Sequence, residues 1–215
     1  MDFTVLESLS LFRLMSEEQI AYCLEATLAY TRKYRKGSFI FRAGDQTDFL
    51  GIVLTGSVTI ESNDLWGNRT LLSHISVGQV FAETYALLFP EPLLVDVVAN
   101  KDSEILFLKV SALSKLPPAP WKELFTANLL RISSQKNLAL SGRSFHTSSK
   151  SARARILSYL NTISLQKNSR EFDIPFDRQQ MADYLNLERT NMSKELGKMK
   201  QEGIIEFRKN HFVLI

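Results

Sequence analysis

The sequence predicts an α+β protein in which a β-rich region precedes one long helix and a small C-terminal domain of short helices and a hairpin. Three observations support this prediction. Short β-prone runs separated by turn residues fill positions 34–110, and a segment without proline or glycine follows four proline-rich positions at 117–120. Two short amphipathic segments joined by a tight turn then lie close to the C-terminus. The length of 215 residues suits one large domain or two ordinary ones.

A helix is predicted over residues 16–30, before the β-rich region, because Ser16 and Gln19 have the spacing of a capping box. The β-prone runs then recur at roughly 10-residue spacing, which predicts an antiparallel sandwich or barrel. These runs are residues 38–41, 50–54, 58–61, 70–75 and 105–110. The turns between them contain Gly37, Gly44-Asp45, Gly56, Gly67-Asn68 and Gly78.

The long helix is predicted over residues 121–143, at roughly 30 Å in length. Proline is tolerated in the first turn of a helix, so Pro117-Pro118-Ala119-Pro120 suits its start. Either core packing or a two-fold dimer seam explains its apolar side. That side contains Leu124, Phe125, Leu130, Ile132 and Leu138. Residues 144–150 are rich in Ser and Thr and lack aliphatic side chains, which predicts a linker or hinge.

The C-terminal third has a further amphipathic helix around Ile156 to Ile163, followed by the pattern of a helix-turn-helix. Asp177 and Gln180 form a helix-start signature, and Asn186 tolerates the left-handed backbone that ends a helix. A second helix starts near Arg189 and stops at Gly203. Its buried side, and that of the first helix, contain Met181, Tyr184, Leu185, Met192, Leu196 and Met199, with small Ala182 at the crossing.

The two helices and a following hairpin predict a winged helix-turn-helix that reads DNA. The β-prone runs 204–207 and 212–215 form the wing. Base reading is predicted for Arg189, Thr190 and Ser193 on the exposed face of the second helix, because arginine pairs with guanine and hydroxyls reach base edges. Lys194 and Lys198 on the same helix could serve either bases or phosphates. Phosphate contacts are predicted for Arg178, Gln179, Lys198, Arg208, Lys209 and His211.

Charge and composition agree with this prediction and exclude several other classes. Residues 147–215 contain 12 basic and 8 acidic side chains, whereas residues 1–146 contain 14 and 15. A basic last third is expected of a domain that meets a polyanion. The single cysteine, Cys23, excludes an internal disulfide and a cysteine-ligated cluster within one chain. An acidic N-terminus and the lack of a long apolar run predict a cytoplasmic protein without a signal peptide or membrane contact. With one cysteine and only three histidines, no metal or cofactor is predicted.

The motifs together resemble the CRP/FNR family of regulators over nearly the whole chain. The turns at Gly44-Asp45, Gly56-Ser57-Val58, Gly67 and Gly78-Gln79-Val80-Phe81-Ala82-Glu83 are similar in order and spacing to those of its cyclic-nucleotide-binding-type β-roll, a double-stranded β-helix or jelly roll. The resemblance implies a sensory β-roll at residues 1–116, a dimerisation helix and hinge at 117–146, and a winged helix-turn-helix at 147–215.

It also implies a homodimer on a palindromic site in double-stranded DNA, with half-sites about one DNA turn apart. The long helices would pair through Leu124, Phe125, Arg131 and Leu138. Arg189, Thr190, Ser193 and Lys194 stand where the base-reading residues of the family lie, so the resemblance implies that role for all four. RNA polymerase is a candidate partner. An effector in the β-roll would alter the long helices and the hinge, and so the spacing of the two recognition helices.

The resemblance fails at the residues that grip a cyclic nucleotide. Members that bind cyclic AMP have a Gly-Glu pair and, further along, an Arg-Ser pair that holds the phosphate. Here Ala82 precedes Glu83, and Leu93-Leu94 stand at the Arg-Ser positions. Leucines offer a phosphate neither a cation nor N–H donors, so we expect an effector other than a cyclic nucleotide.

The remaining pocket is predicted to take an apolar or aromatic molecule with one polar contact. It is bordered by Phe81, Glu83, Tyr85, Leu93 and Leu94. The alternative is that these side chains only fill the β-roll, which leaves a ligand-independent DNA-binding regulator. Haem sensing would need an axial ligand such as His74, and an enzyme on a cupin-like barrel would need a second histidine beside it. We therefore expect a transcription regulator and no enzyme.

Overall fold

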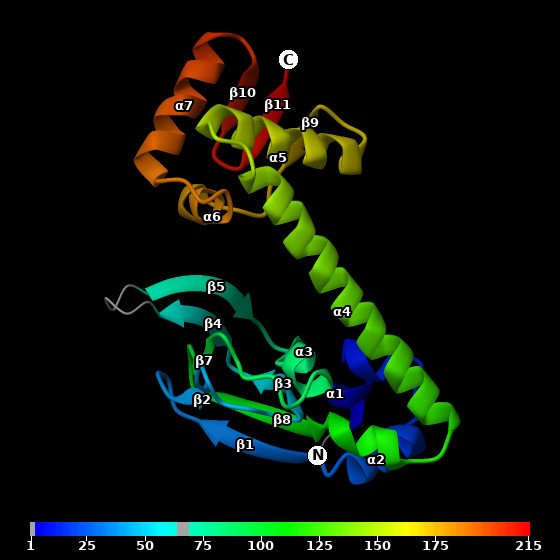
Figure 1. Cartoon of the computed structure of the whole chain (residues 1–215). Coiled ribbons are helices and arrows are strands. Elements are labelled where there is room, and N and C mark those ends of the chain that lie inside the picture. Colours follow the sequence, from blue (N-terminus) through cyan, green and yellow to red (C-terminus); the bar gives the residue numbers. More distant parts are fainter. Residues whose placement is uncertain (1–2, 64–68) are drawn as a thin grey trace. The chain divides into compact units, whose positions relative to one another are not determined.

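The computed structural model describes residues 3–63 and 69–215 and divides into two compact units, Met1–Gln135 and Lys136–Ile215 (Figure 1). Each unit has its own hydrophobic core, so each is described by itself. The turn predicted at Gly67-Asn68 lies outside the described residues.

Two four-stranded antiparallel sheets form the body of the N-terminal unit, which confirms the predicted sandwich architecture. The strand orders are β1-β8-β3-β6 and β2-β7-β4-β5. The strands are β1 (Tyr30–Tyr34), β2 (Phe39–Phe41), β3 (Phe49–Thr55), β4 (Val58–Asn63), β5 (Arg69–Ile75), β6 (Val80–Phe81), β7 (Asp96–Ala99) and β8 (Ser103–Lys109). All five predicted runs correspond to strands. Strands β1, β6 and β7 were not predicted. Strand β1 is a mostly exposed sheet edge without an apolar alternation, and β6 and β7 have only two and four residues.

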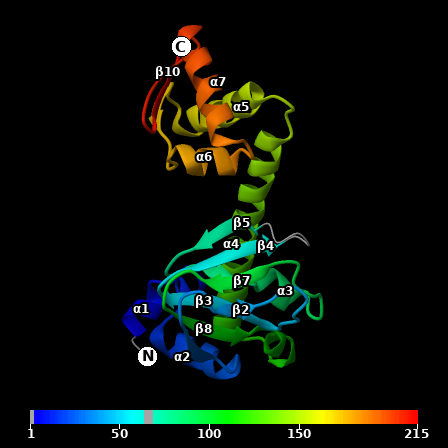
Figure 2. The same ribbon diagram turned by 90° about the vertical axis from the view of Figure 1, so that its left-hand side faces the viewer.

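The N-terminal unit has two cores, one on each face of the sheet that contains β8. Neighbouring side chains of a strand point to opposite faces. Leu106 therefore packs toward the helices, whereas Ile105 and Phe107 pack between the two sheets. Figure 2 shows α1 and α2 on the side of this sheet away from β4 and β5. The short helical segments of this unit are α1 (Phe3–Glu7), η1 (Ser10–Phe12), α2 (Glu17–Ala26), α3 (Glu83–Leu87) and η2 (Val110–Lys115).

Helix α2 begins at the predicted capping box. The Ser16 hydroxyl accepts from the Gln19 N–H at 3.3 Å, and the Gln19 side-chain oxygen accepts from the Ser16 N–H at 3.0 Å. The helix ends before the predicted residue 30, because Leu28 adopts a φ of 49° and the Ala29 N–H donates to the Leu24 carbonyl at 2.8 Å. The chain continues as strand β1 from Tyr30.

Helix α4 (Pro120–Thr147) starts among the prolines as predicted but continues past residue 143. The first residues of the segment predicted to be a linker are therefore helical. The Thr147 hydroxyl donates to the Arg143 carbonyl, four residues earlier, at 2.9 Å. Its hydrogen-bonding capacity is therefore met within the helix, and the chain can remain helical at this residue. Only residues 148–151 lie between α4 and the next helix. On the N-terminal half of α4, Trp121, Phe125 and Leu129 are buried in the helical core.

The C-terminal unit contains the predicted helix-turn-helix and its wing. Its elements are α5 (Ala152–Lys167), β9 (Glu171–Asp173), α6 (Arg178–Tyr184), α7 (Arg189–Gln201), β10 (Ile205–Arg208) and β11 (His211–Leu214). The wing is a three-stranded sheet in the order β10-β11-β9. Strand β9 was not predicted, because three residues are too few to show a period of two. Ala182, Met192 and Leu196 are fully buried where α6 and α7 cross, as the sequence pattern indicated.

Candidate DNA-binding interface and effector domain

Helix α6 and the turn after it have the geometry that the sequence predicted. The Asp177 carboxylate accepts from the Gln180 N–H at 2.8 Å, and the Gln180 side chain accepts from the Asp177 N–H at 2.9 Å. Asn186 adopts a φ of 53°, and the Leu187 N–H donates to the Ala182 carbonyl at 2.9 Å. This is the hydrogen-bond pattern of a helix closed by a left-handed residue.

The N-cap of helix α7 is Glu188, a residue that the sequence analysis did not select. Its carboxylate accepts from the main-chain N–H groups of Thr190 and Asn191, each at 3.2 Å. Hydrogen bonds from Thr190 are the main cause that holds the pKa of Glu188 below its ordinary value. The available signal was its position directly before the first helical residue. Glutamate is a less common cap than Ser, Thr, Asp or Asn.

The two faces of α7 differ sharply in exposure. Met192, Leu196 and Met199 are fully buried. Residues three and four apart share one side of a helix, so Thr190 and Lys194 lie together on the side away from the buried residues, with Ser193 beside them. Lys198 lies one turn further on. Arg189 has the spacing of the buried side, three residues before Met192, and is exposed at the first position of the helix.

The residues predicted to contact phosphate do not share one environment. Gln179, Lys198, Arg208 and Lys209 are exposed. Arg178 is only half-exposed: its guanidinium carbon lies 4.9 Å from the ring centre of Phe207 and 5.1 Å from that of Phe212. Burial lowers the pKa of Arg178, and its Nη1 has no hydrogen-bond partner among the described residues. Arg178 therefore links the start of α6 to the wing.

His211 lies between two carboxylates at the start of β11. Its Nδ1 is 3.0 Å from Asp173 Oδ1 and its Nε2 is 3.2 Å from Glu171 Oε1. Both acidic residues belong to β9, so the unpredicted strand determines the surroundings of this histidine. The described residues contain no group of three or more His, Cys, Asp or Glu side chains placed to hold a metal.

Two arginines that the sequence analysis did not select hold the turn between α6 and α7. Arg143 donates through Nε to the Tyr184 carbonyl at 3.1 Å and through Nη2 to the Asp183 carbonyl at 2.9 Å. Arg155 donates through Nη1 to the Asn186 carbonyl at 2.8 Å. Its Nε donates to the Ser149 carbonyl at 2.6 Å, which ties the segment before α5 to the same turn.

An aromatic cluster lies beside these arginines. The His146 ring centre is 5.7 Å from that of Tyr159 and 6.1 Å from that of Tyr184. His146 is almost fully buried, and burial lowers its pKa. Its Nδ1 is 3.0 Å from the Ser158 hydroxyl. The end of α4 is thus packed into the C-terminal unit.

In the β-sandwich, the residues predicted to border an effector pocket separate into two groups. Phe81 and Leu93 are buried in the core between the sheets together with Phe107. Glu83 is buried at the start of α3. By contrast, Leu94 is 78% exposed. The half-buried Tyr85 accepts from the Leu94 N–H through its hydroxyl at 3.3 Å.

Phe81 fits the sandwich because Gly51 lies against it. A Cβ on Gly51 would overlap the Phe81 ring, so a glycine is required where this ring fills the interior. Ala82 adopts a left-handed backbone with a φ of 58° at the start of α3. His74 is exposed on β5 and does not enter the interior, so it is not placed to ligate a haem there.

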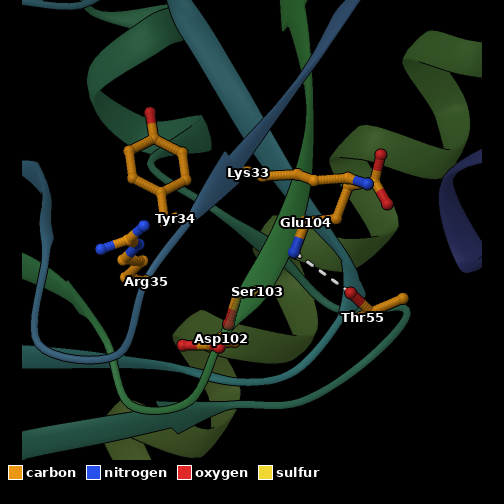
Figure 3. A pocket seen from close by; sticks show the side chains of 7 residues that line it. All are labelled: Lys33, Tyr34, Arg35, Thr55, Asp102, Ser103 and Glu104. Atoms are coloured by element: carbon orange, nitrogen blue, oxygen red, sulfur yellow. Dashed lines mark hydrogen bonds between the residues drawn. The ribbon is translucent and has the colours of Figure 1, made fainter.

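A pocket of about 420 Å³ lies at another place in the N-terminal unit, where β1, β3 and β8 meet (Figure 3). It contains none of the residues predicted for the effector site. Its lining consists of Lys33, Tyr34, Arg35, Thr55, Asp102, Ser103 and Glu104. Several of its polar groups already stabilise the local turns. The Asp102 carboxylate accepts from the Lys36 N–H at 2.8 Å, and the Thr55 hydroxyl accepts from the Glu104 N–H at 3.2 Å.

The residues predicted to form a dimer seam on α4 also differ from one another. Phe125 is fully buried in the N-terminal core, and Leu124 packs partly against that core. Arg131 is exposed, and Leu138 is 75% exposed. Phe125 is therefore a core residue of its own chain.

Comparisons with known proteins support both units. Residues 31–117 match the model of the cyclic nucleotide-binding domain, and residues 154–215 match that of the Crp-like helix-turn-helix domain. The chain is 27% identical over 205 residues to the transcriptional activator protein FnrL of Cereibacter sphaeroides, covering 87% of this chain and 77% of FnrL.

Two solved structures show the same fold. The Catabolite Activator Protein of Thermus thermophilus is 24% identical with a TM-score of 0.50, and 96% of this chain and 93% of that one are covered. CprK in complex with OCPA is 15% identical with a TM-score of 0.66, and the covered shares are 93% and 91%. No helix among the described residues is long and apolar enough to cross a membrane.

A cyclic nucleotide-binding-type β-sandwich followed by a long helix and a winged helix-turn-helix defines a DNA-binding transcription regulator, and not an enzyme. The two matched domains cover most of the sequence and follow one another in the order that this family has. The chain belongs to the CRP/FNR family of transcription regulators.

Proposed function

We propose that this regulator acts as a homodimer, reads a palindromic DNA site through α7 and responds to no cyclic nucleotide. The observation that carries the DNA-reading part is the arrangement of α7. Thr190 and Lys194 are exposed on the side opposite the buried core residues of the helix, and Arg189 is exposed at its first position. A rigid helix with polar side chains at its N-terminal end suits insertion into the major groove.

Within this proposal, the phosphate contacts come from side chains that are free to reach the backbone. Lys198 on α7 and Arg208 and Lys209 on the wing are exposed, and all three follow the base-reading positions along the chain. Arg178 instead supports the wing through Phe207 and Phe212. His211 is held by two carboxylates, which would have to move before it could approach a phosphate.

The dimer would form through the side of α4 that faces away from the buried core. At 100° per residue, Leu130, Leu138 and Phe145 lie within one side of the helix, opposite Phe125. Their side chains are 67%, 75% and 67% exposed. An apolar row on a long helix favours pairing with a second copy of that helix. The proposed seam therefore keeps Leu138 and the flanking Arg131 and leaves out Phe125.

The absence of cyclic nucleotide binding is proposed from Leu93. It stands where the family resemblance implies an arginine for the phosphate, and it is buried among apolar side chains that include Phe81 and Phe107. A phosphate brought there would lose water without gaining a cation. The same packing favours the second candidate function, a regulator whose β-sandwich only stabilises the dimer and binds no effector.

A binding experiment tests the proposal. Selection from random DNA with the full chain is expected to recover a palindrome with half-sites about one helical turn apart. The Arg189→Ala variant is expected to lose about 1–3 kcal/mol of binding free energy and its preference at one base pair per half-site. Equal weakening on every sequence would instead make Arg189 a phosphate contact. A non-palindromic site, or a monomer in sedimentation, would contradict the dimer.

Calorimetric titration and thermal unfolding test whether the β-sandwich binds an effector. Cyclic AMP and cyclic GMP are expected to give no heat of binding and no rise in melting temperature. Apolar carboxylic acids test the predicted effector site at Glu83 and Tyr85. Binding of either nucleotide would overturn this part of the proposal. Contact with RNA polymerase and a cytoplasmic location would follow from action on a chromosome, and both stay proposals.

A further inference from the structure

The N-terminus of the recognition helix α7 carries an acidic group of its own chain. The first N–H groups of a helix have no partners within the helix and attract anions. In DNA-binding proteins, such N–H groups commonly contact phosphates. Here the N–H groups of Thr190 and Asn191 are already taken by the Glu188 carboxylate, each at 3.2 Å.

The Glu188 carboxylate is held by hydrogen bonds and remains accessible to a further donor. One carboxylate oxygen accepts from the Thr190 N–H and the other from the Asn191 N–H, and the Thr190 side chain adds a third hydrogen bond. A carboxylate has about four lone-pair sites, so it can still accept from a further donor. The residue is exposed and directly precedes Arg189, the first of the proposed base-reading residues. The hydrogen bonds from Thr190 and the nearby charge of Lys194 lower its pKa, so the group is ionised at neutral pH.

An ionised carboxylate offers only acceptors, and this restricts what it can face in the major groove. Cytosine N4 and adenine N6 present amino donors there, whereas guanine presents the acceptors O6 and N7. A carboxylate therefore gains a charge-assisted hydrogen bond from an amino group and is repelled by the guanine edge and by phosphate. A serine at the same position would cap the helix without this selectivity.

We propose that Glu188 is a specificity-determining residue, whose carboxylate, held on the N-terminus of α7, accepts a hydrogen bond from a cytosine or adenine amino group and keeps phosphates away from that helix end. This inference rests on the proposed placement of α7 in the major groove. It adds a discriminating contact to those of Arg189, Thr190, Ser193 and Lys194. It also implies lower affinity for DNA of unrelated sequence than a neutral cap would give.

The test measures DNA-binding affinity for the wild-type protein and the variants Glu188→Ser and Glu188→Asp. The DNA set contains the selected palindrome, random-sequence DNA, and every palindrome in which one base pair is changed in the same way in both half-sites. Glu188→Ser retains a helix cap but loses the charge. It is expected to lose at least about fivefold of the discrimination at one position per half-site. It is also expected to bind random DNA more tightly, with a steeper salt dependence. Glu188→Asp keeps both cap and charge and should retain the weak binding to random DNA.

The outcomes separate this inference from the proposed function. Unchanged preference at every position in Glu188→Ser, with a normal melting temperature and a normal effect of Arg189→Ala, would reduce Glu188 to a helix cap and overturn the inference alone. If Arg189→Ala and Glu188→Ser both left every preference unchanged, α7 would not be the reading helix, and the proposed function would fail first.

Discussion

The guanidinium of Arg143 on α4 donates from Nε to the main-chain carbonyl of Tyr184 on α6 at 3.1 Å, and its carbon lies 5.8 Å from the centre of the Tyr184 ring. The last carbonyls of a helix have no partners within it. Arg143 supplies such a partner to α6, as Arg155 does for the following turn. The final turns of the long helix are thus bonded directly to the element that positions α7.

Replacing Arg143 by alanine is expected to weaken DNA binding on all sequences and to destabilise the C-terminal unit by about 1–2 kcal/mol, because a charged donor to two carbonyls is lost. Lys150→Ala is a suitable control, since it also removes an exposed positive charge close to α5. Chemical denaturation and fluorescence anisotropy measure the two effects. A change in sequence preference without a loss of stability would contradict a positioning role.

Ala82 is expected to be strained, because it holds a φ of 58° without being glycine. Ala82→Gly should stabilise the β-sandwich by about 1 kcal/mol, since a side chain is disfavoured in the left-handed region. Ala86→Gly on the same short helix is the matched control and should destabilise it, because Ala86 is buried. Urea denaturation of both variants measures the difference. Destabilisation by Ala82→Gly would show that the side chain contributes more packing than the backbone costs.

Gly51→Ala is expected to destabilise the β-sandwich by about 1–3 kcal/mol, because the new methyl group would overlap the Phe81 ring. Combining it with Phe81→Leu should recover part of that loss. Gly142→Ala on α4 meets no neighbouring atom and is expected to be neutral or stabilising by up to about 1 kcal/mol. Equal unfolding free energies for Gly51→Ala and the wild type would contradict the close packing of Phe81 on Gly51.

Cys23 is expected to be unreactive in the folded protein. Burial raises the pKa of its thiol from 9.0 to about 12, so the nucleophilic thiolate is rare at neutral pH. Iodoacetamide at pH 8 should modify Cys23 slowly in buffer and quickly in urea. Because the folded pKa lies above the unfolded value, this group stabilises the fold below pH 9.0 and loses that contribution as the pH rises toward about 12. Rapid modification under native conditions would show that the core around α2 opens.

The helix boundaries of the DNA-binding unit were predictable because their causes are local. Asp177 with Gln180, Asn186 and Gly203 each act within one turn of the backbone, so their spacing along the chain carries the information. The β-prone runs were predictable for the same reason. Strands β1, β6, β7 and β9 were not, since β1 is a polar edge and the other three are short.

The surroundings of the candidate site residues were not predictable in this way. Arg178 stacks on the wing, His211 is held by β9, and Phe125 belongs to a core rather than to a seam. In each case the partner comes from an element distant along the chain. The charge of an arginine or histidine reveals that it needs a partner, but not which one.

The sequence by itself determined the order of the domains and the ends of α6 and α7, and it contains Leu93 where the family resemblance implies an arginine. Each depends on local backbone chemistry or on the identity of one side chain. Only the tertiary structure decided which polar groups remain free to meet DNA. Folding brings Arg143 and Arg155 to the turn, Arg178 to the wing and Glu188 to the first N–H groups of α7, and satisfied groups are no longer available to a ligand.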